Sequence, residues 1–384
     1  MSPVGVGLRR RAWNVLDGSW LPDADCCPPN RQVYPHQWLW DSCFHAIAWA
    51  ALGDERAVTE LTSCFAAQLE GGFVPHMRYL GPTVGRGPLP DRSSFTQPPV
   101  FAHTARVLVD RGFAVPRSTL DAIGRALDWL WRERRTDDGL VFIVHPWESG
   151  ADDSPRWDDW IGVPAYDKEA YRAVDRRLVD AAEFDAAGVA CWSREFVVAP
   201  AAFNALVVHA LREYAALTGD GLSVARADEL GAACDASLWD DREQLWADRP
   251  VVGGGAGGGG SSGWPTLDGV LGALATPDEA RANVALDQVL DEARFAAPFG
   301  VRYVPRGHPA YLPDQYWRGP GWPQLNYLVS VTAQRWGRAD VCERVARWST
   351  AAAEASGLAE YWNPETGGGL GAVPQGWAAL AATY

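Results

Sequence analysis

Residues 200–219 read PAAFNALVVHALREYAALTG and carry the clearest helical pattern in the chain. The larger apolar side chains recur at intervals of three and four residues, so they form one stripe along a helix of period 3.6. The stripe comprises Phe203, Leu206, Val207, Ala210, Leu211, Tyr214 and Leu217. Gly219 follows, where a glycine cap commonly ends a helix. The segment therefore predicts a helix over residues 200–218 that packs against other helices.

Helical patterns of the same kind continue on both sides of this segment. The clear ones cover 41–52, 55–69, 100–112, 118–134, 223–239, 278–291, 322–335 and 339–355, and weaker ones cover 167–182, 267–275 and 376–383. Strand signals are confined to short pieces such as 140–144 and 300–304. About a dozen helices, joined by alternately short and long loops, indicate antiparallel pairs closed into an α/α toroid. We expect an all-α fold whose long loops collect at one mouth.

The helical pattern extends over the whole chain, so we expect one domain over residues 1–384. Residues 253–263, GGGAGGGGSSG, predict a flexible loop of low complexity. Because helices of one kind lie on both sides, we interpret this loop as an insertion between neighbouring helices and not as a domain linker.

Composition excludes several classes of function. The net charge is −14, and the 34 basic residues form no stripe, so we expect neither a nucleic-acid partner nor a membrane surface. Seven cysteines show no metal-binding spacing, which favours a reducing compartment. We see no signal peptide and no apolar run of about 18 residues, so we predict a cytoplasmic protein.

Carboxylates and tryptophans are concentrated in residues 145–160, HPWESGADDSPRWDDW. Such a mixture suits either a sugar-binding hydrolytic site or a divalent cation. Pro155 and Arg156 separate the two aspartate pairs, which departs from the DDxxD spacing of magnesium-dependent cyclases and puts a positive charge inside a cation site. Many of the 20 tryptophans also lie in segments broken by Pro or Gly, where aromatic faces can line a polar pocket and cover sugar rings. We therefore favour a carbohydrate site without a metal.

Five segments together resemble glycoside hydrolase family 63, most closely its branch that hydrolyses mannosylglycerate and glucosylglycerate. They are WDSCFHA (40–46), SSFTQPP (93–99), ESGADDSPRWD (148–158), YWRGPGWPQLNYL (316–328) and EYWNPETGGGLGA (360–372). They run in the family's order and span nearly the whole chain, although trehalases share the Glu-Ser-Gly-x-Asp part. The resemblance implies an (α/α)6 barrel and an inverting α-glycosidase that needs no cofactor.

The resemblance also implies the two catalytic carboxylates. Asp152 stands at the position of the general acid and Glu360 at that of the general base. In an inverting hydrolase these groups lie roughly 6.5 to 9.5 Å apart, which leaves room for the attacking water. The acid must hold its proton near neutral pH, and Trp147, Trp157 and Asp153 are expected to provide its setting.

Further residues are carried over from the family as substrate contacts. Trp40 is expected to stack on the sugar at the cleavage subsite and Asp41 to accept hydrogen bonds from its hydroxyl groups, although Asp41 or Ser42 also suits a helix N-cap. Glu148 is predicted to be structural and to pair with Arg156. The sequence departs from the family at Asp153, Gly321 and Gly368. The full set of expected sugar or aglycone contacts is Tyr34, Trp38, Trp40, Asp41, Gln97, Tyr316, Arg318, Trp322 and Gln375.

A small carbohydrate is the expected partner, and a glycerate aglycone would need cationic groups for its carboxylate. The candidates are Arg78, Arg92, Arg176 and Arg177, with Tyr166 and Tyr171 as hydroxyl donors. Two alternatives stay open: a trehalase-like hydrolase of a neutral disaccharide, and a non-catalytic sugar-binding protein on the same barrel. The sequence leaves open whether the sugar is glucose or mannose, and the resemblance allows a homo-oligomer.

Overall fold

The computed structural model describes residues 3–82, 87–162, 166–252 and 264–384. The predicted Gly-rich loop 253–263 lies outside these residues. In the part of the chain that is described, no helix combines the length and the apolar character needed to cross a bilayer.

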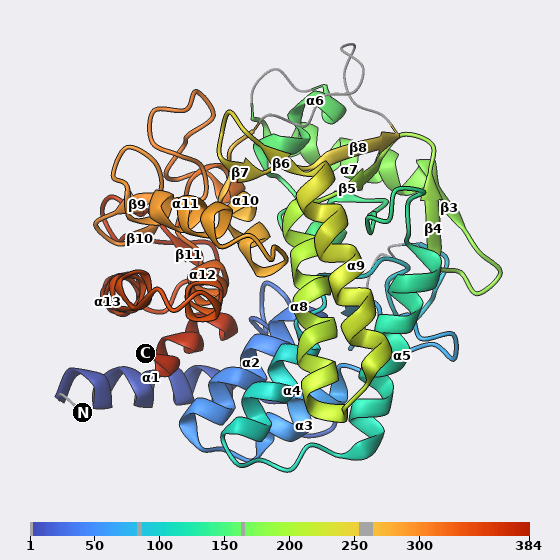
Figure 1. Ribbon diagram of the computed structural model, residues 1–384. Coiled ribbons are helices and arrows are strands. Elements are labelled where there is room, and N and C mark those ends of the chain that lie inside the picture. Colours follow the sequence, from blue (N-terminus) through green and yellow to red (C-terminus); the bar gives the residue numbers. More distant parts are fainter. Residues whose placement is uncertain (1–2, 83–86, 163–165, 253–263) are drawn as a thin grey trace.

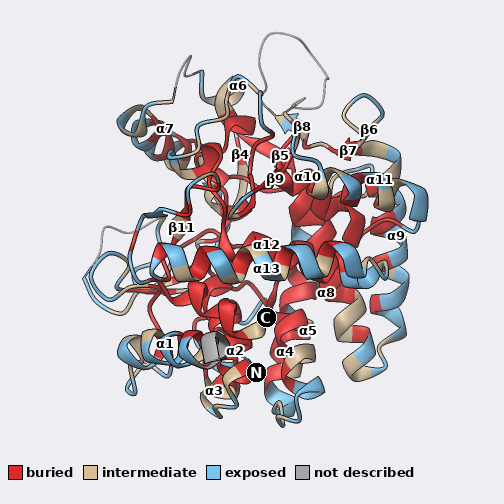
Figure 2. Cartoon of the chain, turned by 90° about the vertical axis from the view of Figure 1, so that its left-hand side faces the viewer, coloured by how far each residue is buried: buried red, intermediate tan, exposed pale blue. Residues whose placement is uncertain are grey.

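Six helical segments form a closed inner ring within the described residues (Figure 1). Each segment contacts the next, and the last returns to contact α2, which closes the ring. These segments are buried on nearly all sides, as the red inner helices of Figure 2 show, and 13 of the 14 residues of α2 are buried. The ring consists of α2 (Leu39–Leu52), α4 (Phe101–Asp110), α8 (Ala201–Thr218), α10 (Leu267–Leu271), α12 (Pro323–Arg335) and the 3-10 helix η5 (Gly376–Thr383).

A second set of helices packs around this ring. Each alternates with the inner segments along the chain, and each keeps one face exposed, as the red and blue stripes of α13 show in Figure 2. This pairing confirms the expected (α/α)6 barrel. The outer helices are α1 (Pro3–Ser19), α3 (Arg56–Ser63), α5 (Arg117–Glu133), α9 (Gly221–Ser237), α11 (Glu279–Leu290) and α13 (Ala339–Ser356).

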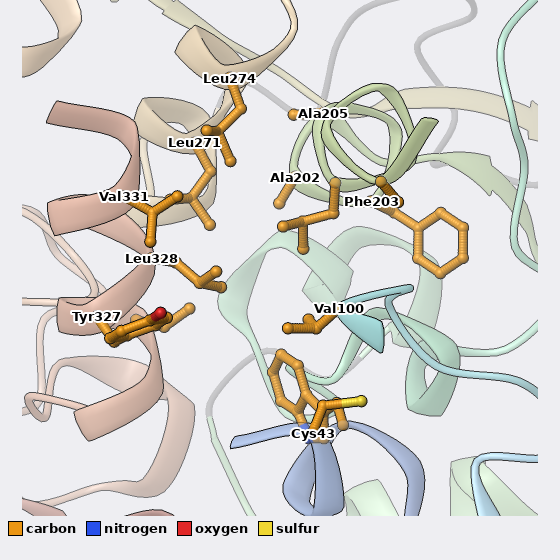
Figure 3. Close-up of a cluster of buried hydrophobic side chains, with 14 of the residues drawn as sticks. Cys43, Val100, Ala202, Phe203, Ala205, Leu271, Leu274, Tyr327, Leu328 and Val331 are labelled. Atoms are coloured by element: carbon orange, nitrogen blue, oxygen red, sulfur yellow. The ribbon is translucent and has the colours of Figure 1, made fainter. Parts of the chain in front are cut away.

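The core lies inside the ring, where apolar side chains of the inner segments converge (Figure 3). Cys43 of α2, Phe203 of α8, Leu271 of α10 and Leu328 of α12 are all buried there. The apolar stripe predicted for residues 200–218 is present, but Ala201–Leu211 is buried all round because α8 is an inner helix. The interior of the barrel is therefore a packed core.

The connections between the barrel helices contain short strands and short helical pieces. The strands form two-stranded antiparallel pairs: β1 (Gln37–Trp38) with β2 (Met77–Arg78), β3 (Ala182–Phe184) with β4 (Ala190–Ser193), β5 (Val197–Ala199) with β8 (Arg249–Val252), β6 (Trp239–Asp240) with β7 (Leu245–Trp246), β9 (Ala296–Ala297) with β10 (Gly300–Val301), and β11 (Tyr361–Trp362) with β12 (Gly369–Leu370). The remaining helical pieces are η1 (Pro146–Ser149), η2 (Pro155–Trp157), α6 (Asp158–Ile161), α7 (Lys168–Ala181), η3 (Gly272–Leu274) and η4 (Tyr316–Arg318).

Of the predictions for single elements, one is confirmed and others differ from the structure. Gly219 ends α8 in the left-handed conformation, as predicted, with φ of 76°. The predicted strand at 140–144 forms only isolated bridges, and helix α1 was not predicted. The N-cap prediction for Asp41 or Ser42 is wrong, because α2 begins at Leu39. The Trp40 N–H is satisfied instead by Gln97 Oε1 at 3.2 Å, which leaves the Asp41 carboxylate available for another role.

The closed ring predicts where a leucine matters for stability. Leu328 is fully buried in the core, so Leu328→Ala should lower the free energy of unfolding by about 2 to 5 kcal/mol. Leu222 on α9 is 56% exposed, and Leu222→Ala, the matched control, should change it by less than about 0.5 kcal/mol. Chemical denaturation of both variants measures the difference, and equal losses would contradict the placement of α12 in the inner ring.

Candidate active site

A cavity of about 1090 Å³ opens among the loops that connect the helices. Its walls come from the segments before α2 and α4, from η1 and the loop after it, from α7, from η4, and from the segment between α13 and η5. The closed ring is what brings these distant segments together. Side chains that line it include Tyr34, Trp38, Trp40, Asp41, Gln97, Trp147, Asp152, Lys168, Tyr316, Trp317, Glu360, Tyr361, Gln375 and Trp377.

Nine of the eleven residues predicted for the site line this cavity, and Asp152 and Glu360 are among them. The other two, Arg318 and Trp322, are 2% and 1% exposed and do not belong to the lining. Both lie one layer behind the wall, so their placement favours support of the wall over the direct sugar contact predicted for them.

Glu360 is held in place by donors from two sides. Tyr34 donates its hydroxyl to the carboxylate, 3.0 Å from Oε1, and the Ala372 N–H donates to Oε2 at 2.9 Å. Gly371 has a φ of 70°, and a Cβ there would overlap Glu360 Oε2. The glycine is therefore needed both for its backbone conformation and for the space that the carboxylate occupies.

Burial is the main cause of the raised pKa values of two carboxyl groups in the cavity. Burial raises the pKa of Glu360 to about 7, although the hydrogen bonds from Ala372 and Tyr34 lower it. Burial likewise raises the pKa of Asp41 to about 7, against the opposing effects of His45 and of the Gln375 side chain. Gln375 Nε2 donates to Asp41 Oδ1 at 3.2 Å. Both groups thus change charge near neutral pH, the range in which acid–base catalysts work best.

Asp152 is tied to a stack of aromatic rings. Trp317 donates its indole N–H to Asp152 Oδ1 at 3.1 Å. The Trp317 ring stacks on Trp322 at 3.7 Å between centroids, and Trp322 stacks on Tyr361 at 4.5 Å. Tyr361 directly follows Glu360, so one continuous stack connects the surroundings of both carboxylates.

Close backbone approaches shape the wall around Asp152. Gly150 has a φ of 76°, and a Cβ there would lie 2.5 Å from the Trp40 ring, so the loop packs flat on this tryptophan. Trp157 is fully buried and donates its N–H to the Ala151 carbonyl at 2.8 Å. At Gly321, a Cβ would lie 2.5 Å from Trp362 Nε1. These contacts explain why small residues stand beside the tryptophans.

Asp153, the neighbour of Asp152, is fully buried and paired. Lys168 Nζ lies 2.6 Å from Asp153 Oδ2, and Tyr166 donates its hydroxyl to the same oxygen at 2.8 Å. Burial alone would lower the pKa of Lys168, but the charges of Asp152 and Asp153 outweigh it and raise the pKa. The extra negative charge of Asp153 is therefore compensated by the only lysine of the chain.

Three more charged side chains of residues 145–160, Glu148, Arg156 and Asp158, form ion pairs with partners outside this segment. Arg318 forms a bidentate ion pair with Asp158, with Nη1 donating to Oδ2 at 2.6 Å and Nη2 to Oδ1 at 2.7 Å. The predicted pair of Glu148 with Arg156 is wrong. Glu148 pairs with Arg134 at 2.8 and 3.0 Å, whereas Arg156 pairs with Asp248 at 2.7 Å and Asp268 at 3.3 Å. Arg134 directly follows helix α5 and lies 14 residues before Glu148, beyond the reach of a local helical pattern.

Two groups of side chains in the described residues have the composition of a metal site. They are Cys27, His45 and Glu60, and His103, His209 and Glu213. None of these residues lines the cavity. Of the aspartates described in residues 145–160, Asp153 and Asp158 each have a cationic partner.

Comparison with known proteins fits this geometry. The model of a family described as the mannosylglycerate hydrolase MGH1-like glycoside hydrolase domain matches residues 34–378. The chain belongs to this family. It is thus a glycoside hydrolase of family 63, in the branch of the mannosylglycerate hydrolases.

Individual members of the family are similar over nearly the full length. A mannosylglycerate hydrolase of Thermus thermophilus is 30% identical over 93% of this chain and 95% of its own. A glucosylglycerate hydrolase of Mycolicibacterium hassiacum is 28% identical over 97% and 96%. A crystal structure of a family 63 mannosylglycerate hydrolase of Thermus thermophilus with Tris and D-glycerate superposes with a TM-score of 0.83, at 26% identity, over 98% of both chains.

Sequence reasoning missed part of the cavity of this family 63 hydrolase. Lys168 and Arg172 of α7 line it and were not predicted. Of the residues predicted for the aglycone, Arg176 and Tyr166 line the cavity, whereas Arg78, Arg92, Arg177 and Tyr171 do not. Spacing of four residues places the three basic side chains on one face of a helix. That spacing, together with the presence of a single lysine among 33 arginines, was the signal available in the sequence.

The raised pKa of Glu360 predicts that the ionised Glu360 carboxylate lowers the stability of the folded protein. Since the folded-state pKa of about 7 exceeds the ordinary value of 4.5, the charge on Glu360 costs stability as the pH rises through this interval. Glu360→Gln should therefore be more stable than the wild type at pH 8, by about 1 to 3 kcal/mol, and the difference should shrink at pH 5.

Thermal unfolding at the two pH values measures this effect, and Glu365→Gln is the control. Burial would raise the pKa of Glu365, but Arg302 and Tyr311 outweigh it and lower the pKa. Glu365→Gln should accordingly lose stability at pH 8. A loss for Glu360→Gln as well would contradict the raised pKa.

Proposed function

We propose that this hydrolase cleaves mannosylglycerate or glucosylglycerate with inversion, using Asp152 as general acid and Glu360 as general base. The observation that carries the proposal is that two carboxyl groups, from segments far apart in sequence, line the same cavity in different settings. The helical scheme runs from α1 to η5, which also supports a single catalytic domain over residues 1–384.

The setting of Glu360 suits a base. Its pKa of about 7 allows it to be ionised at neutral pH and still to accept a proton. In the proposed step Glu360 removes a proton from a water molecule, and the resulting hydroxide attacks the anomeric carbon. Tyr34 holds the carboxylate from one side and so fixes its orientation at the cavity wall.

Asp152 acts as the general acid in the proposed reaction. It donates a proton to the glycosidic oxygen as the bond to the anomeric carbon breaks, and the aglycone leaves as an alcohol. The Trp317 N–H holds Oδ1 and so fixes the orientation of the carboxyl group toward the leaving group. Water supplies both the new C–O bond and the proton that Glu360 accepts, so the reaction needs no further reactant.

The cavity also offers a site for the sugar ring between these groups. Trp40 lines the wall beside Gly150, and Asp41 with Gln375 supplies an acceptor and a donor for hydroxyl groups. Asp41 is 4% exposed, so a sugar hydroxyl that reaches it forms its hydrogen bond away from water. This arrangement supports recognition of one sugar unit at the end of the cavity.

Three basic side chains of α7 favour an anionic aglycone, and Asp175 and Asp180 of the same helix also line the cavity. Lys168, Arg172 and Arg176 follow one another along the cavity wall, and Lys168 lies 4.3 Å from the ring centre of Tyr316. The solved relative with D-glycerate shows that a member of the family binds this anion. We propose that this face of α7, chiefly Arg176, receives the glycerate carboxylate.

The catalytic assignment is tested with Asp152→Asn and Glu360→Gln on mannosylglycerate, glucosylglycerate and trehalose. Loss of a general acid or base should lower kcat by about a hundredfold to ten-thousandfold on the preferred substrate. Proton NMR of the first sugar released should show the β-anomer, as inversion demands. Near wild-type turnover by either variant, or release of the α-anomer first, would refute the assignment.

The aglycone assignment is tested with Arg176→Met. We expect KM for the glycerate-bearing substrate to rise about tenfold or more, because a charge-assisted contact is worth roughly 1.5 to 3 kcal/mol, while hydrolysis of a neutral glycoside should not change. Arg177→Met is the matched control, since Arg177 is the next residue but pairs with Glu195 at 3.0 Å outside the cavity. Equal effects of the two variants would rule out a role for Arg176.

A further inference from the structure

Lys168, the first residue of helix α7, lies between the cavity and the buried Asp153 carboxylate. It lines the cavity, and its side chain is 40% exposed, whereas the side chain of Asp153 is fully buried. Its Nζ lies 2.6 Å from Asp153 Oδ2. Asp152 directly precedes Asp153 and lines the cavity as well. The ion pair therefore joins α7 to the loop that carries Asp152.

Among the described residues, Asp153 forms no ion pair other than the one with Lys168. Tyr166 donates its hydroxyl to Asp153 Oδ2 at 2.8 Å, but Oδ1 is buried without a hydrogen-bond partner. The Arg318 guanidinium lies 4.6 Å from the ring centre of Tyr166, but its charge is paired with Asp158. A buried carboxylate that loses its one cationic partner is strongly destabilising, so the Asp153 loop depends on Lys168.

Lys168 also contacts the aromatic group that holds Asp152. Its Nζ lies 4.3 Å from the ring centre of Tyr316, a distance typical of a cation–π interaction. Tyr316 packs edge-on against Trp317, with 5.9 Å between the ring centroids, and the Trp317 N–H donates to Asp152 Oδ1. One ammonium group thus contacts the residue that follows Asp152 and the ring beside the indole that binds Asp152.

The charges around Lys168 agree with this placement. Burial would lower the pKa of Lys168, but the charges of Asp152 and then Asp153 raise it. The ammonium group therefore lies within the electrostatic reach of both carboxyl groups. A contact with only one of them would leave the other free to move independently of α7.

We propose that Lys168 is a positioning residue for the general acid. Its ammonium group neutralises Asp153 and holds the Asp152 loop against η4, so that the Asp152 carboxyl group faces the leaving oxygen of the substrate. The inference rests on the proposed function of Asp152. It gives Lys168 a role different from that of Arg176, because Lys168 acts through Asp152 and Arg176 is proposed to meet the aglycone itself.

The first test compares two leaving groups in Lys168→Met. A glycosyl fluoride releases fluoride ion, which needs no proton from an acid, whereas glycerate leaves as an alcohol only when its oxygen is protonated. We expect kcat for the preferred glycerate glycoside to fall about tenfold to a hundredfold, and kcat for the matching α-glycosyl fluoride to change less than about threefold. Equal losses on both substrates would overturn the inference, because a general disturbance of the structure predicts that result.

Arg177→Met is the matched control. It removes another ion pair of α7, with Glu195 at 3.0 Å, outside the cavity. The ratio of the two kcat values should keep its wild-type value in this variant. A change as large as in Lys168→Met would contradict the assignment, since any weakening of α7 would then suffice.

Asp152→Asn separates the inference from the proposed function. As the general acid, it should lose turnover of the glycerate glycoside and keep most of its turnover of the fluoride. If Asp152→Asn shows this dependence and Lys168→Met does not, the inference alone fails. If Asp152→Asn loses both substrates equally, the assignment of the acid fails and the inference fails with it.

A second test examines whether Lys168 acts through Asp153. Lys168→Met leaves the buried carboxylate without its cation, whereas the double variant Lys168→Met/Asp153→Asn removes both charges, and the new amide oxygen can still accept the Tyr166 hydroxyl. The double variant should hydrolyse the glycerate glycoside within about threefold of Asp153→Asn alone. Its unfolding temperature should exceed that of Lys168→Met by about 4 °C or more. A double variant that matches Lys168→Met in both measurements would refute the proposed role.

Discussion

The stacked rings of Trp317, Trp322 and Tyr361 connect the surroundings of the two carboxyl groups in the cavity. Their centroids are 3.7 and 4.5 Å apart, and the first ring holds Asp152 while the last follows Glu360 in the chain. Aromatic rings in contact have few rotamers, so the stack restricts the indole that holds Asp152 and the backbone next to Glu360. The surroundings of two carboxyl groups on different loops are thereby connected through three packed rings.

Buried arginines give the loops around this stack their fixed shape. Arg134, Arg156 and Arg318 each bind carboxylates of other segments, and all three are at most 2% exposed. A guanidinium offers a planar set of donors that can satisfy a carboxylate through two parallel bonds, which a lysine cannot do. This property accounts for the presence of carboxylate-rich, proline-broken segments deep in the protein, and for the near absence of lysine from the chain.

The sequence revealed the helices well and the polar contacts poorly. Helical period depends on neighbours three and four residues apart, so α8 and most of the ring were predictable. The resemblance to family 63 named the nine predicted site residues that line the cavity. The pairing of Glu148 with Arg134, the position of Trp322 behind the wall and the start of α2 at Leu39 depend on contacts between distant segments. Helix α1 was not predicted, because arginines and glycines interrupt its apolar positions, such as Leu8 and Leu16.

Helix α7 belongs to neither ring of the barrel, as Figures 1 and 2 show, yet it lines the cavity through Lys168, Arg172 and Arg176. The scaffold that holds the two carboxyl groups and the basic side chains proposed to meet the leaving group therefore come from separate parts of the chain. Lys168 also pairs with the buried Asp153, so Arg172 and Arg176 are the positions whose charge can change without removing that pair. One barrel could in this way give rise to enzymes for different aglycones through changes in a single peripheral helix.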